Sequence, residues 1–267
     1  MNPFKVAAVQ MVSEPSVEAN LSAAGVLIDR AAQMGARLVA LPEYFCLFGM
    51  RDRDKVAVRE ADGDGPIQRF LSESAARHGI WLVGGSVPLA APDPGKVMNS
   101  CLVFDEHGRR VARYDKIHLF GFETGGERYD EAATIEAGAV PIALDSPFGR
   151  LGLSICYDVR FPELYRRLAP VDIILVPSAF TATTGRVHWE ILLRARAIEN
   201  LAYVIAPAQG GRHPNGRETH GHTMVIDPWG SVLACQPKGP GVVMAEIDPA
   251  YRAELRASLP ALEHRVL

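Results

Sequence analysis

The sequence predicts an α/β fold whose sheets are mixed rather than purely parallel. Apolar runs of strand length recur along the 267 residues, and amphipathic helical segments lie between several of them. Two turn sequences, at 105–109 and 227–231, are typical of hairpins, which join antiparallel strands. We therefore expect strands joined by helices and strands joined by hairpins in the same molecule.

The expected elements follow in chain order. Five apolar residues at helical spacing predict a helix over 17–34: Leu21, Ala24, Leu27, Ile28 and Ala31. A second helix is expected over 67–77, with Pro66 in its first turn, and a third surrounds His188. Strands are expected at 6–11, 38–41, 81–87, 101–104, 151–155, 173–176, 202–207 and 223–226.

Composition and charge argue against several classes of partner and against a membrane span. The net charge is −3 and basic residues are scattered, so nucleic acids and anionic membranes are poor partners. No apolar run is long enough to span a membrane, and the N-terminal residues lack a signal-peptide pattern. No linker divides the chain, so we expect a single domain over 1–267.

The cysteines predict a reducing environment. The chain has four, widely spaced, with no CxxC pair and no metal-ligand pattern: Cys46, Cys101, Cys156 and Cys235. Free thiols of this kind are typical of cytoplasmic proteins. We therefore expect a cytoplasmic protein with no metal and no organic cofactor.

Three reactive side chains stand where strand-like runs end. Glu43 ends the run from 37, Lys116 the run from 110, and Cys156 the run from 151. In layered α/β folds, sites gather at the carboxyl ends of strands. Backbone N–H groups at a strand-to-helix turn lower the pKa of a thiol and can bind an oxyanion. Taken singly, each residue has a plainer interpretation: a buried structural cysteine, a solvated glutamate and a surface lysine.

Together these residues lie in segments that resemble the nitrilase superfamily of carbon–nitrogen hydrolases. The segments are LPE at 41–43, YDKIHLF at 114–120, CYDVRFPEL at 156–164, PSAF at 177–180, TGRVHWE at 184–190, RARAIEN at 194–200 and GHTMVIDPWG at 221–230. They cover nearly the whole chain. The resemblance implies a four-layer α-β-β-α sandwich and subunits that pack as a homodimer or a larger homo-oligomer.

The resemblance implies a catalytic triad of Glu43, Lys116 and Cys156. A thiolate is a strong nucleophile, but at its reference pKa of about 8.5 only a few per cent exists at neutral pH. Glu43 is expected to remove the thiol proton, while Lys116 favours the thiolate and stabilises the oxyanion. The backbone N–H of Tyr157 is the second expected oxyanion donor. The result is a thioester on Cys156, which water activated by Glu43 hydrolyses.

The resemblance also implies a second glutamate shortly after the lysine. Glu131 is the best match for this position, and Glu127 and Glu136 are nearby competitors. Glu131 is expected to orient Lys116 and to lend acid–base support, because a carboxylate and an ammonium offset each other's desolvation.

The substrate is expected to be a small amide that carries a carboxylate. Through 177–180, 193–200 and 208–213 the chain most resembles the amidases that hydrolyse deaminated glutathione to 2-oxoglutarate and cysteinylglycine. The alternative is the ω-amidase branch, which acts on 2-oxoglutaramate and 2-oxosuccinamate. An alternative of a different class is a binding protein on the same fold without catalytic activity.

Arg160, four residues past the nucleophile, is the candidate cation for the substrate carboxylate, because arginine pairs carboxylates bidentately. Its alternative is an internal salt bridge to Asp158 or Glu163. Further residues are expected to line the pocket or to contact the far end of a longer substrate: Phe180, Thr181, Thr184, Arg212 and His213.

Overall fold

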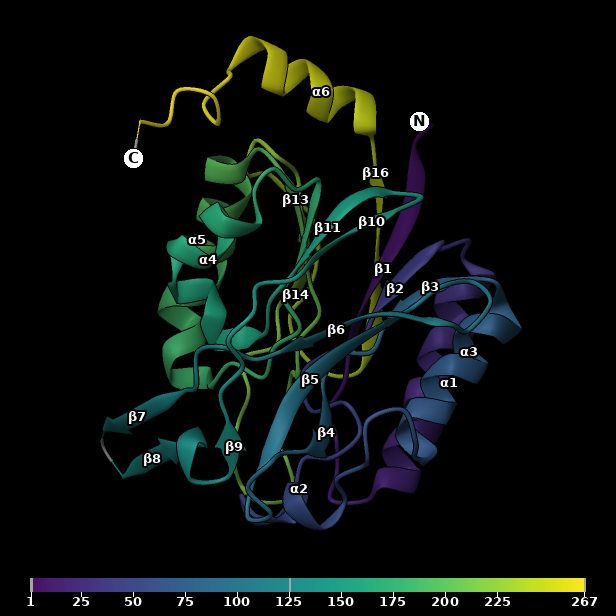
Figure 1. Cartoon of the computed structure of the whole chain (residues 1–267), viewed down its shortest axis with the longest axis vertical. Helices are drawn as coiled ribbons and strands as arrows, with labels where there is room; N and C mark the ends of the chain where they lie inside the picture. The colour runs from purple at the N-terminus through teal and green to yellow at the C-terminus, as the bar shows by residue number, and fades with distance from the viewer. Residues whose placement is uncertain (1, 125, 267) are drawn as a thin grey trace.

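Two β-sheets lie between two pairs of helices in the computed structural model, which describes residues 2–124 and 126–266 (Figure 1). Helices α1 (Val17–Gln33) and α3 (Pro66–His78) cover the outer face of one sheet. Helices α4 (Pro162–Leu168) and α5 (Ala182–Asn200) cover the outer face of the other. This is the four-layer α-β-β-α sandwich that the resemblance implies, so that prediction is confirmed.

The first sheet has the order β16-β1-β2-β3-β5-β4, and β6 and β9 also pair with β5. Strands β1, β2 and β3 are parallel to one another, and β16 is antiparallel to β1. Strand β5 is antiparallel to each of β3, β4 and β6. The bounds are β1 Phe4–Gln10, β2 Leu38–Ala40, β3 Trp81–Val83, β4 Val87–Ala90, β5 Val97–Phe104, β6 Arg110–Asp115, β9 Ile135–Glu136 and β16 Gly241–Ile247.

The second sheet has the order β10-β11-β12-β13-β14-β15, with β11, β12 and β13 parallel and the others antiparallel. Its strands are β10 Ala143–Ser146, β11 Gly149–Leu153, β12 Ile173–Leu175, β13 Tyr203–Ala206, β14 Thr223–Ile226 and β15 Val232–Gln236. The smaller elements are α2 Asp54–Ala57, the hairpin β7 Gly121–Thr124 with β8 Glu127–Asp130, η1 Glu131–Ala133, η2 Cys156–Arg160 and α6 Pro249–Ser258.

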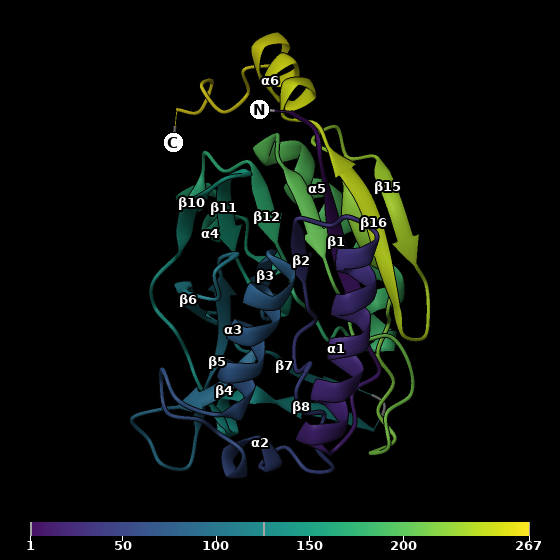
Figure 2. The ribbon, with the colours of Figure 1, turned by 90° about the vertical axis from the view of Figure 1, so that its right-hand side faces the viewer.

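Side-chain alternation along β1 explains the layers. Val6 and Ala8 are fully buried in the core between the two sheets, whereas Ala7 and Val9 are fully buried in the core beneath α1 and α3. Successive side chains of a strand point to opposite faces, so a strand covered on both sides reads as a continuous apolar run. Figure 2 shows α1 and α3 in front of this sheet, with α6 beyond the ends of the strands. No described helix combines the length and apolarity needed to cross a membrane.

The expected hairpins at 105–109 and 227–231 are present, and they join β5 to β6 and β14 to β15. The single strand expected over 81–87 is wrong, because the chain turns after β3 and starts again as β4. Gly85 has a φ of +55°, and a Cβ on it would lie 2.1 Å from the Pro42 carbonyl oxygen. Only glycine fits this close approach. Ser86 then accepts a hydrogen bond from the Tyr44 N–H at 3.0 Å. The turn therefore holds the loop that carries Glu43.

Candidate active site

Cys156 lies at a sharp turn between β11 and α4. Its φ of +48° falls in the left-handed region, which a non-glycine residue rarely adopts. Its backbone N–H donates to the Pro177 carbonyl at 2.9 Å, and 8% of the residue is exposed. A strained turn that directs a side chain into a cavity is typical of functional positions.

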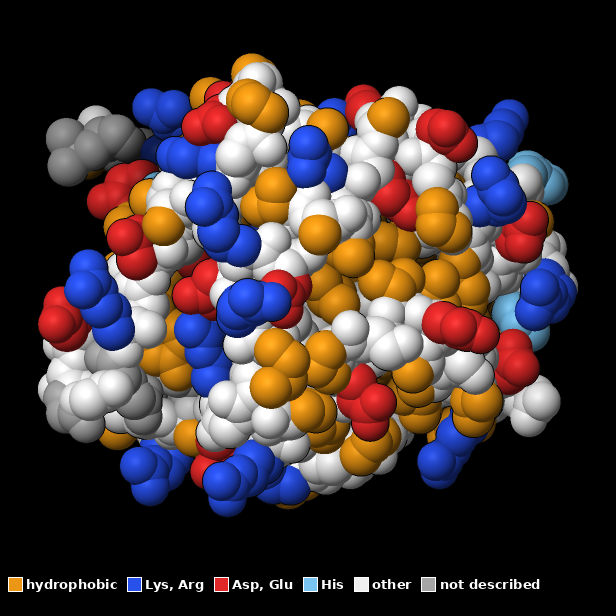
Figure 3. Space-filling view, turned by 90° about the horizontal axis from the view of Figure 1, so that it is seen from below, with side chains coloured by type: hydrophobic (Ala, Val, Ile, Leu, Met, Phe, Trp, Pro, Cys, Tyr) orange, Lys and Arg blue, Asp and Glu red, His pale blue; other side chains and the backbone are white. Residues whose placement is uncertain are grey.

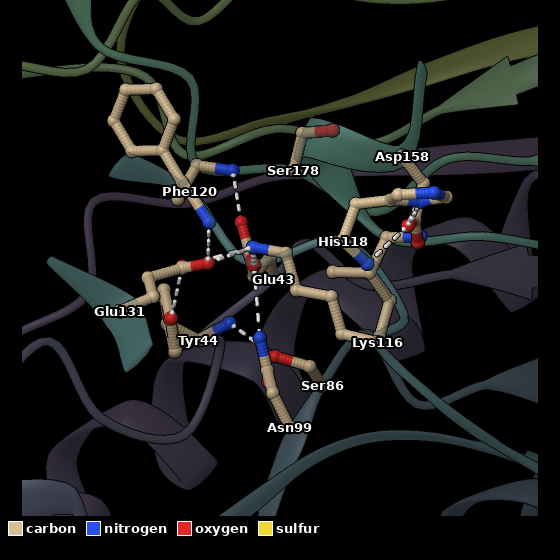
Figure 4. A network of polar contacts seen from close by, with 12 residues as sticks. Glu43, Tyr44, Ser86, Asn99, Lys116, His118, Phe120, Glu131, Asp158 and Ser178 are labelled. Carbon is tan, nitrogen blue, oxygen red and sulfur yellow. Dashed lines mark hydrogen bonds and ion pairs between the residues drawn. The ribbon is translucent and has the colours of Figure 1, made fainter. Parts of the chain in front are cut away.

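Asp158 fixes this turn from within the core. One carboxylate oxygen accepts from the Ile155 N–H at 2.8 Å and from the Tyr114 hydroxyl at 2.7 Å. The other accepts from the His118 N–H at 3.0 Å and lies 2.8 Å from His118 Nδ1 (Figure 4). Asp158 is fully buried. One carboxylate therefore ties the turn of Cys156 to the segment that follows β6.

Glu43 follows β2 and is almost fully buried. Its Oε1 accepts hydrogen bonds from Lys116 Nζ at 2.8 Å and from Asn99 Nδ2 at 3.0 Å. Its Oε2 accepts from the Ala179 N–H at 2.9 Å, and the Cys156 thiol is a further hydrogen-bond partner of this carboxyl group. The carboxylate is thus held rigidly beside the thiol.

The Lys116 ammonium lies between two carboxylates. Its Nζ is 2.8 Å from Glu43 and 2.8 Å from Glu131, and the side chain has no exposed surface. Glu131, in η1, also accepts from the Tyr44 hydroxyl at 2.8 Å and from the Phe120 N–H at 2.7 Å (Figure 4). A cation with two hydrogen-bonded anions offsets the desolvation of all three groups.

Of Glu131 and Glu136, Glu131 is the one that the structure brings to Lys116. The Glu136 carboxylate lies instead 3.5 Å from the Asp93 N–H. The side chain of Glu127 lies outside the described residues.

The pKa of the Cys156 thiol is raised, whereas the sequence predicted that its surroundings would lower it. Lys116 lowers the pKa of the Cys156 thiol, but burial and the Glu43 charge outweigh it and raise that pKa well above its usual value. Burial also raises the pKa of Glu43, against the opposing effect of Lys116. Burial alone would lower the pKa of Lys116, but Glu131 and Glu43 together raise it. The resting site therefore holds a neutral thiol and a charged ammonium.

A hollow of about 620 Å³, part of it open to solvent, leads to Cys156, Glu43 and Glu131. Two cations that the sequence analysis missed also line this catalytic pocket. The Lys55 Nζ, in α2, lies 5.3 Å from the centroid of the Tyr44 ring, and burial lowers its pKa. Arg217 pairs with Asp52 at 2.9 Å. Neither cation lies in a segment that carries the family resemblance, so no sequence signal identified it.

Thr181 lines the pocket, whereas Phe180 and Thr184, which were also expected there, are not among its lining residues. Thr181 caps α5 by accepting from the Thr184 N–H at 3.2 Å, and the two hydroxyl oxygens are 2.9 Å apart. The Phe180 ring packs against Trp189 with the centroids 4.9 Å apart. Thr184 thus supports the lining residue Thr181, whereas the Phe180 ring packs against α5.

Arg160 lies outside the residues that line the catalytic pocket. Its guanidinium stacks over the rings of Tyr157 and Phe180, at 5.7 and 5.4 Å from their centroids, and contacts His188 Nδ1 at 3.2 Å. Within the described ranges it forms no salt bridge to Asp158 or Glu163. The alternative salt bridge is therefore not formed, and the guanidinium lies among aromatic rings; the role of Arg160 as the substrate cation stays a prediction.

The loop after β13 also differs from expectation. Arg212 is exposed and does not line the pocket. His213 is buried and stacks on Phe48 with the centroids 3.7 Å apart, while its two ring nitrogens lie 2.9 Å from Ser13 O and Thr219 Oγ1. His213 thus supports Phe48, which forms part of the pocket wall. Over 2–124 and 126–266, no group of three or more His, Cys, Asp or Glu residues is arranged to hold a metal ion.

Comparison with known proteins places this geometry in a family. The carbon–nitrogen hydrolase family model matches residues 5–257. A deaminated glutathione amidase from Synechocystis sp. (strain PCC 6803 / GT-S) is 46% identical, covering 100% of this chain and 99% of the relative. The Homo sapiens deaminated glutathione amidase is 38% identical, covering 97% and 81%.

Solved structures agree. Saccharomyces cerevisiae Nit3, described as a member of branch 10 of the nitrilase superfamily, superposes with a TM-score of 0.90 at 32% identity, covering 100% of this chain and 97% of Nit3. The Caenorhabditis elegans NitFhit protein gives 0.91 at 40% identity, and this chain spans 66% of that longer chain. The chain belongs to the carbon–nitrogen hydrolase family of the nitrilase superfamily.

Proposed function

We propose that the protein is an amidase that hydrolyses deaminated glutathione to 2-oxoglutarate and cysteinylglycine through a thioester on Cys156. The observation that carries this proposal is the buried Glu43–Lys116–Glu131 network beside a strained thiol, at the end of a pocket that also holds Lys55 and Arg217. The relatives named deaminated glutathione amidase, at 38–46% identity, support the choice of substrate.

Acylation begins from a neutral thiol. As the sulfur attacks the amide carbon, Glu43 takes the thiol proton, so no free thiolate has to exist beforehand. The carbonyl oxygen becomes an oxyanion that accepts hydrogen bonds from Lys116 Nζ and the Tyr157 N–H. When the carbon–nitrogen bond breaks, Glu43 gives the proton to the leaving amine. The acyl group remains on Cys156 as a thioester.

Deacylation reverses these roles. Glu43 takes a proton from water, whose oxygen attacks the thioester carbon, and the same two donors hold the second oxyanion. The carbon–sulfur bond breaks, the proton returns from Glu43 to the sulfur, and the acid leaves. Glu131 acts as a positioning residue, because its bonds to Lys116 and Tyr44 keep the ammonium aimed at the oxyanion.

Lys55 and Arg217 are the cations that we assign to the carboxylate of the acyl part. Both line the pocket that leads to Cys156. Burial lowers the pKa of Lys55, so an anionic partner would stabilise its charged form. For Arg160 we propose a positioning role instead, since its guanidinium stacks on Tyr157, the neighbour of the nucleophile.

The test is a panel of deaminated glutathione, 2-oxoglutaramate and 2-oxosuccinamate, with product mass and ammonia release as readouts. The proposal predicts the highest kcat/KM for deaminated glutathione. A ratio that clearly favours 2-oxoglutaramate would move the protein to the ω-amidase branch. No turnover of any of the three would favour the catalytically silent binding protein.

We propose a homodimer, or a larger homo-oligomer, in which a second copy of the chain covers the outer face of α5. Exposed apolar side chains gather there and on the adjoining hairpin: Val187, Ile191, Ile198 and Trp229. Exposed patches of this kind are typical of interaction sites. Light scattering should give a smaller particle for Ile191→Asp than for a control, Val140→Asp. Equal masses for the two variants would remove this face as the interface.

We also propose that residues 1–267 form one catalytic domain, that catalysis needs no cofactor, and that the protein is cytoplasmic. The described residues of both sheets share one apolar core, which supports a single domain. The mechanism needs Cys156 reduced, and all four cysteines are free. A reducing compartment keeps such a thiol available. Activity that survives chelators and disappears after alkylation of Cys156 would support the mechanism; activity lost to chelators would refute it.

A further inference from the structure

A second hollow, which we call the outer hollow, opens beside the catalytic pocket. Its empty space is about 1510 Å³, including open solvent, and it lies between the β7–β8 hairpin, the start of α5 and the loop at 215–218. Tyr129, Arg217 and Glu218 line both hollows. A substrate whose carbonyl lies at Cys156 can therefore extend into the outer hollow.

The described lining of the outer hollow is rich in positive charge. It holds Arg128, Arg186, Arg217 and Lys238 against one carboxylate, Glu218. Lys238 pairs with Glu218 at 3.2 Å, and Arg217 is engaged by an aspartate. Arg128 and Arg186 are exposed, and neither forms an ion pair within the described ranges. Figure 3 views the molecule from below, and Lys and Arg side chains are most frequent in its left half, the side on which Figure 1 places β7 and β8.

A histidine lines the same hollow and interacts with two of these cations. His220 lines the outer hollow and stacks on His222 with the ring centroids 4.1 Å apart. Burial lowers its pKa to about 4, and the charges of Lys238 and Arg186 contribute in the same direction. The first residues of α5, Ala182 and Thr183, line the hollow as well. An anion placed here would be stabilised by several groups at once.

We propose that the outer hollow binds the terminal carboxylate of the peptide amine that departs as the thioester forms, with Arg128 and Arg186 as the binding cations. This inference rests on the proposed function, in which the leaving group is a dipeptide. Two extended residues span about 7 Å, so the carboxylate lies well beyond the reacting carbon. A substrate with a carboxylate at each end thus meets cations at each end: Lys55 and Arg217 for the acyl part, Arg128 and Arg186 for the peptide.

The experiment compares three amides with the same acyl group: deaminated glutathione, its C-terminal carboxamide, and 2-oxoglutaramate, which has no peptide. For Arg186→Gln and Arg128→Gln, kcat/KM for deaminated glutathione should fall about tenfold, mainly through KM, because each loses one charge-assisted hydrogen bond. The values for the other two amides should change less than about twofold, since neither carries the terminal carboxylate. Arg167→Gln, an exposed arginine of α4 outside both hollows, is the matched control.

The outcomes separate this inference from the proposed function. The role of the outer hollow would be overturned if kcat/KM of the Arg186→Gln and Arg128→Gln variants fell equally for all three amides, or did not fall for deaminated glutathione. Either result would leave the proposed function intact. If the native enzyme cleaves only 2-oxoglutaramate, the proposed function fails. Cysteinylglycine is then tried as a competitive inhibitor: weaker inhibition in Arg186→Gln than in Arg167→Gln supports the hollow, and equal inhibition overturns it. No turnover of any amide refutes both.

Discussion

Replacing Asp158 with asparagine perturbs the turn that carries Cys156, while the side chain at position 158 keeps nearly the same volume. The carboxylate accepts from two backbone N–H groups, those of Ile155 and His118, one at each oxygen. An asparagine amide has one acceptor oxygen and one NH₂ donor. Whichever way the amide is oriented, one backbone N–H faces another donor and loses its acceptor.

The cost can be estimated from these contacts. A hydrogen bond to a charged group contributes about 1.5–3 kcal/mol, and a buried orphaned donor adds a desolvation penalty, so we expect a loss of about 3 kcal/mol. For a protein of this size, about 1 kcal/mol shifts Tm by about 2–4 °C, which gives a decrease of about 6–12 °C. Activity should fall as well, because the Ile155 N–H directly precedes Cys156 and the His118 segment leads back to Lys116.

The assay is scanning calorimetry together with kcat, both measured on one preparation of Asp158→Asn. Asp145→Asn is the matched control, because this side chain is 88% exposed and lies 3.6 Å from its partner Arg150. Exposed pairs contribute about 0–1 kcal/mol, so the control should stay close to the native Tm. An Asp158→Asn variant with native Tm and native kcat would refute the role of this carboxylate.

Three further predictions follow from other parts of the structure. Gly85→Ala should lower Tm and kcat together, because its Cβ meets the Pro42 carbonyl at a position with positive φ; a native-like variant would contradict this. Lys55→Met should raise KM for deaminated glutathione and for 2-oxoglutaramate alike, since both carry the acyl carboxylate; an unchanged KM would remove Lys55 as its partner. The folded-state pKa of His220, about 4, lies below the unfolded value of 6.5, so its contribution to stability is present above pH 6.5 and is lost as pH falls toward 4. Tm should therefore fall less steeply over that window in His220→Gln, and parallel curves would argue against it.

The sequence predicted many elements of the fold because their signals are local, whereas the four layers were implied by the family resemblance. Apolar runs, helical spacing and turn residues place β1, α1 and the two hairpins without any knowledge of distant contacts. The break at Gly85 was missed because it depends on the Pro42 carbonyl, which is distant in the sequence. An apolar run that contains two glycines is equally compatible with one strand.

The residues of the site also include some that the sequence predicted and some that only the fold could identify. Glu43, Lys116 and Cys156 stand in distinctive segments at strand ends, and the structure brings them together. Glu131 could not be separated from Glu127 and Glu136 in sequence, since only the fold of the loop decides which carboxylate reaches Lys116. Arg160 was expected to face the substrate because of its distance along the chain from the nucleophile. Sequence spacing does not encode the aromatic stacking on Tyr157 and Phe180 that surrounds its guanidinium.

Lys55 and Arg217 could not be identified from sequence motifs. Each enters the catalytic pocket from a segment outside the resemblance, a short helix and a loop. The thiol pKa is a similar case, because it depends on burial and on the combined charge of several side chains. These properties become visible only when the neighbours are known in three dimensions.

The central claim is that Cys156 carries the acyl group and Glu43 moves the proton. The most direct test is rapid-quench mass spectrometry of the enzyme during turnover of deaminated glutathione, with peptide mapping of the adduct. The account predicts a 2-oxoglutaryl adduct on the peptide that contains Cys156, none in Cys156→Ala, and acylation slowed at least about 100-fold in Glu43→Gln. Native turnover by Cys156→Ala, or an adduct on another residue, would contradict it.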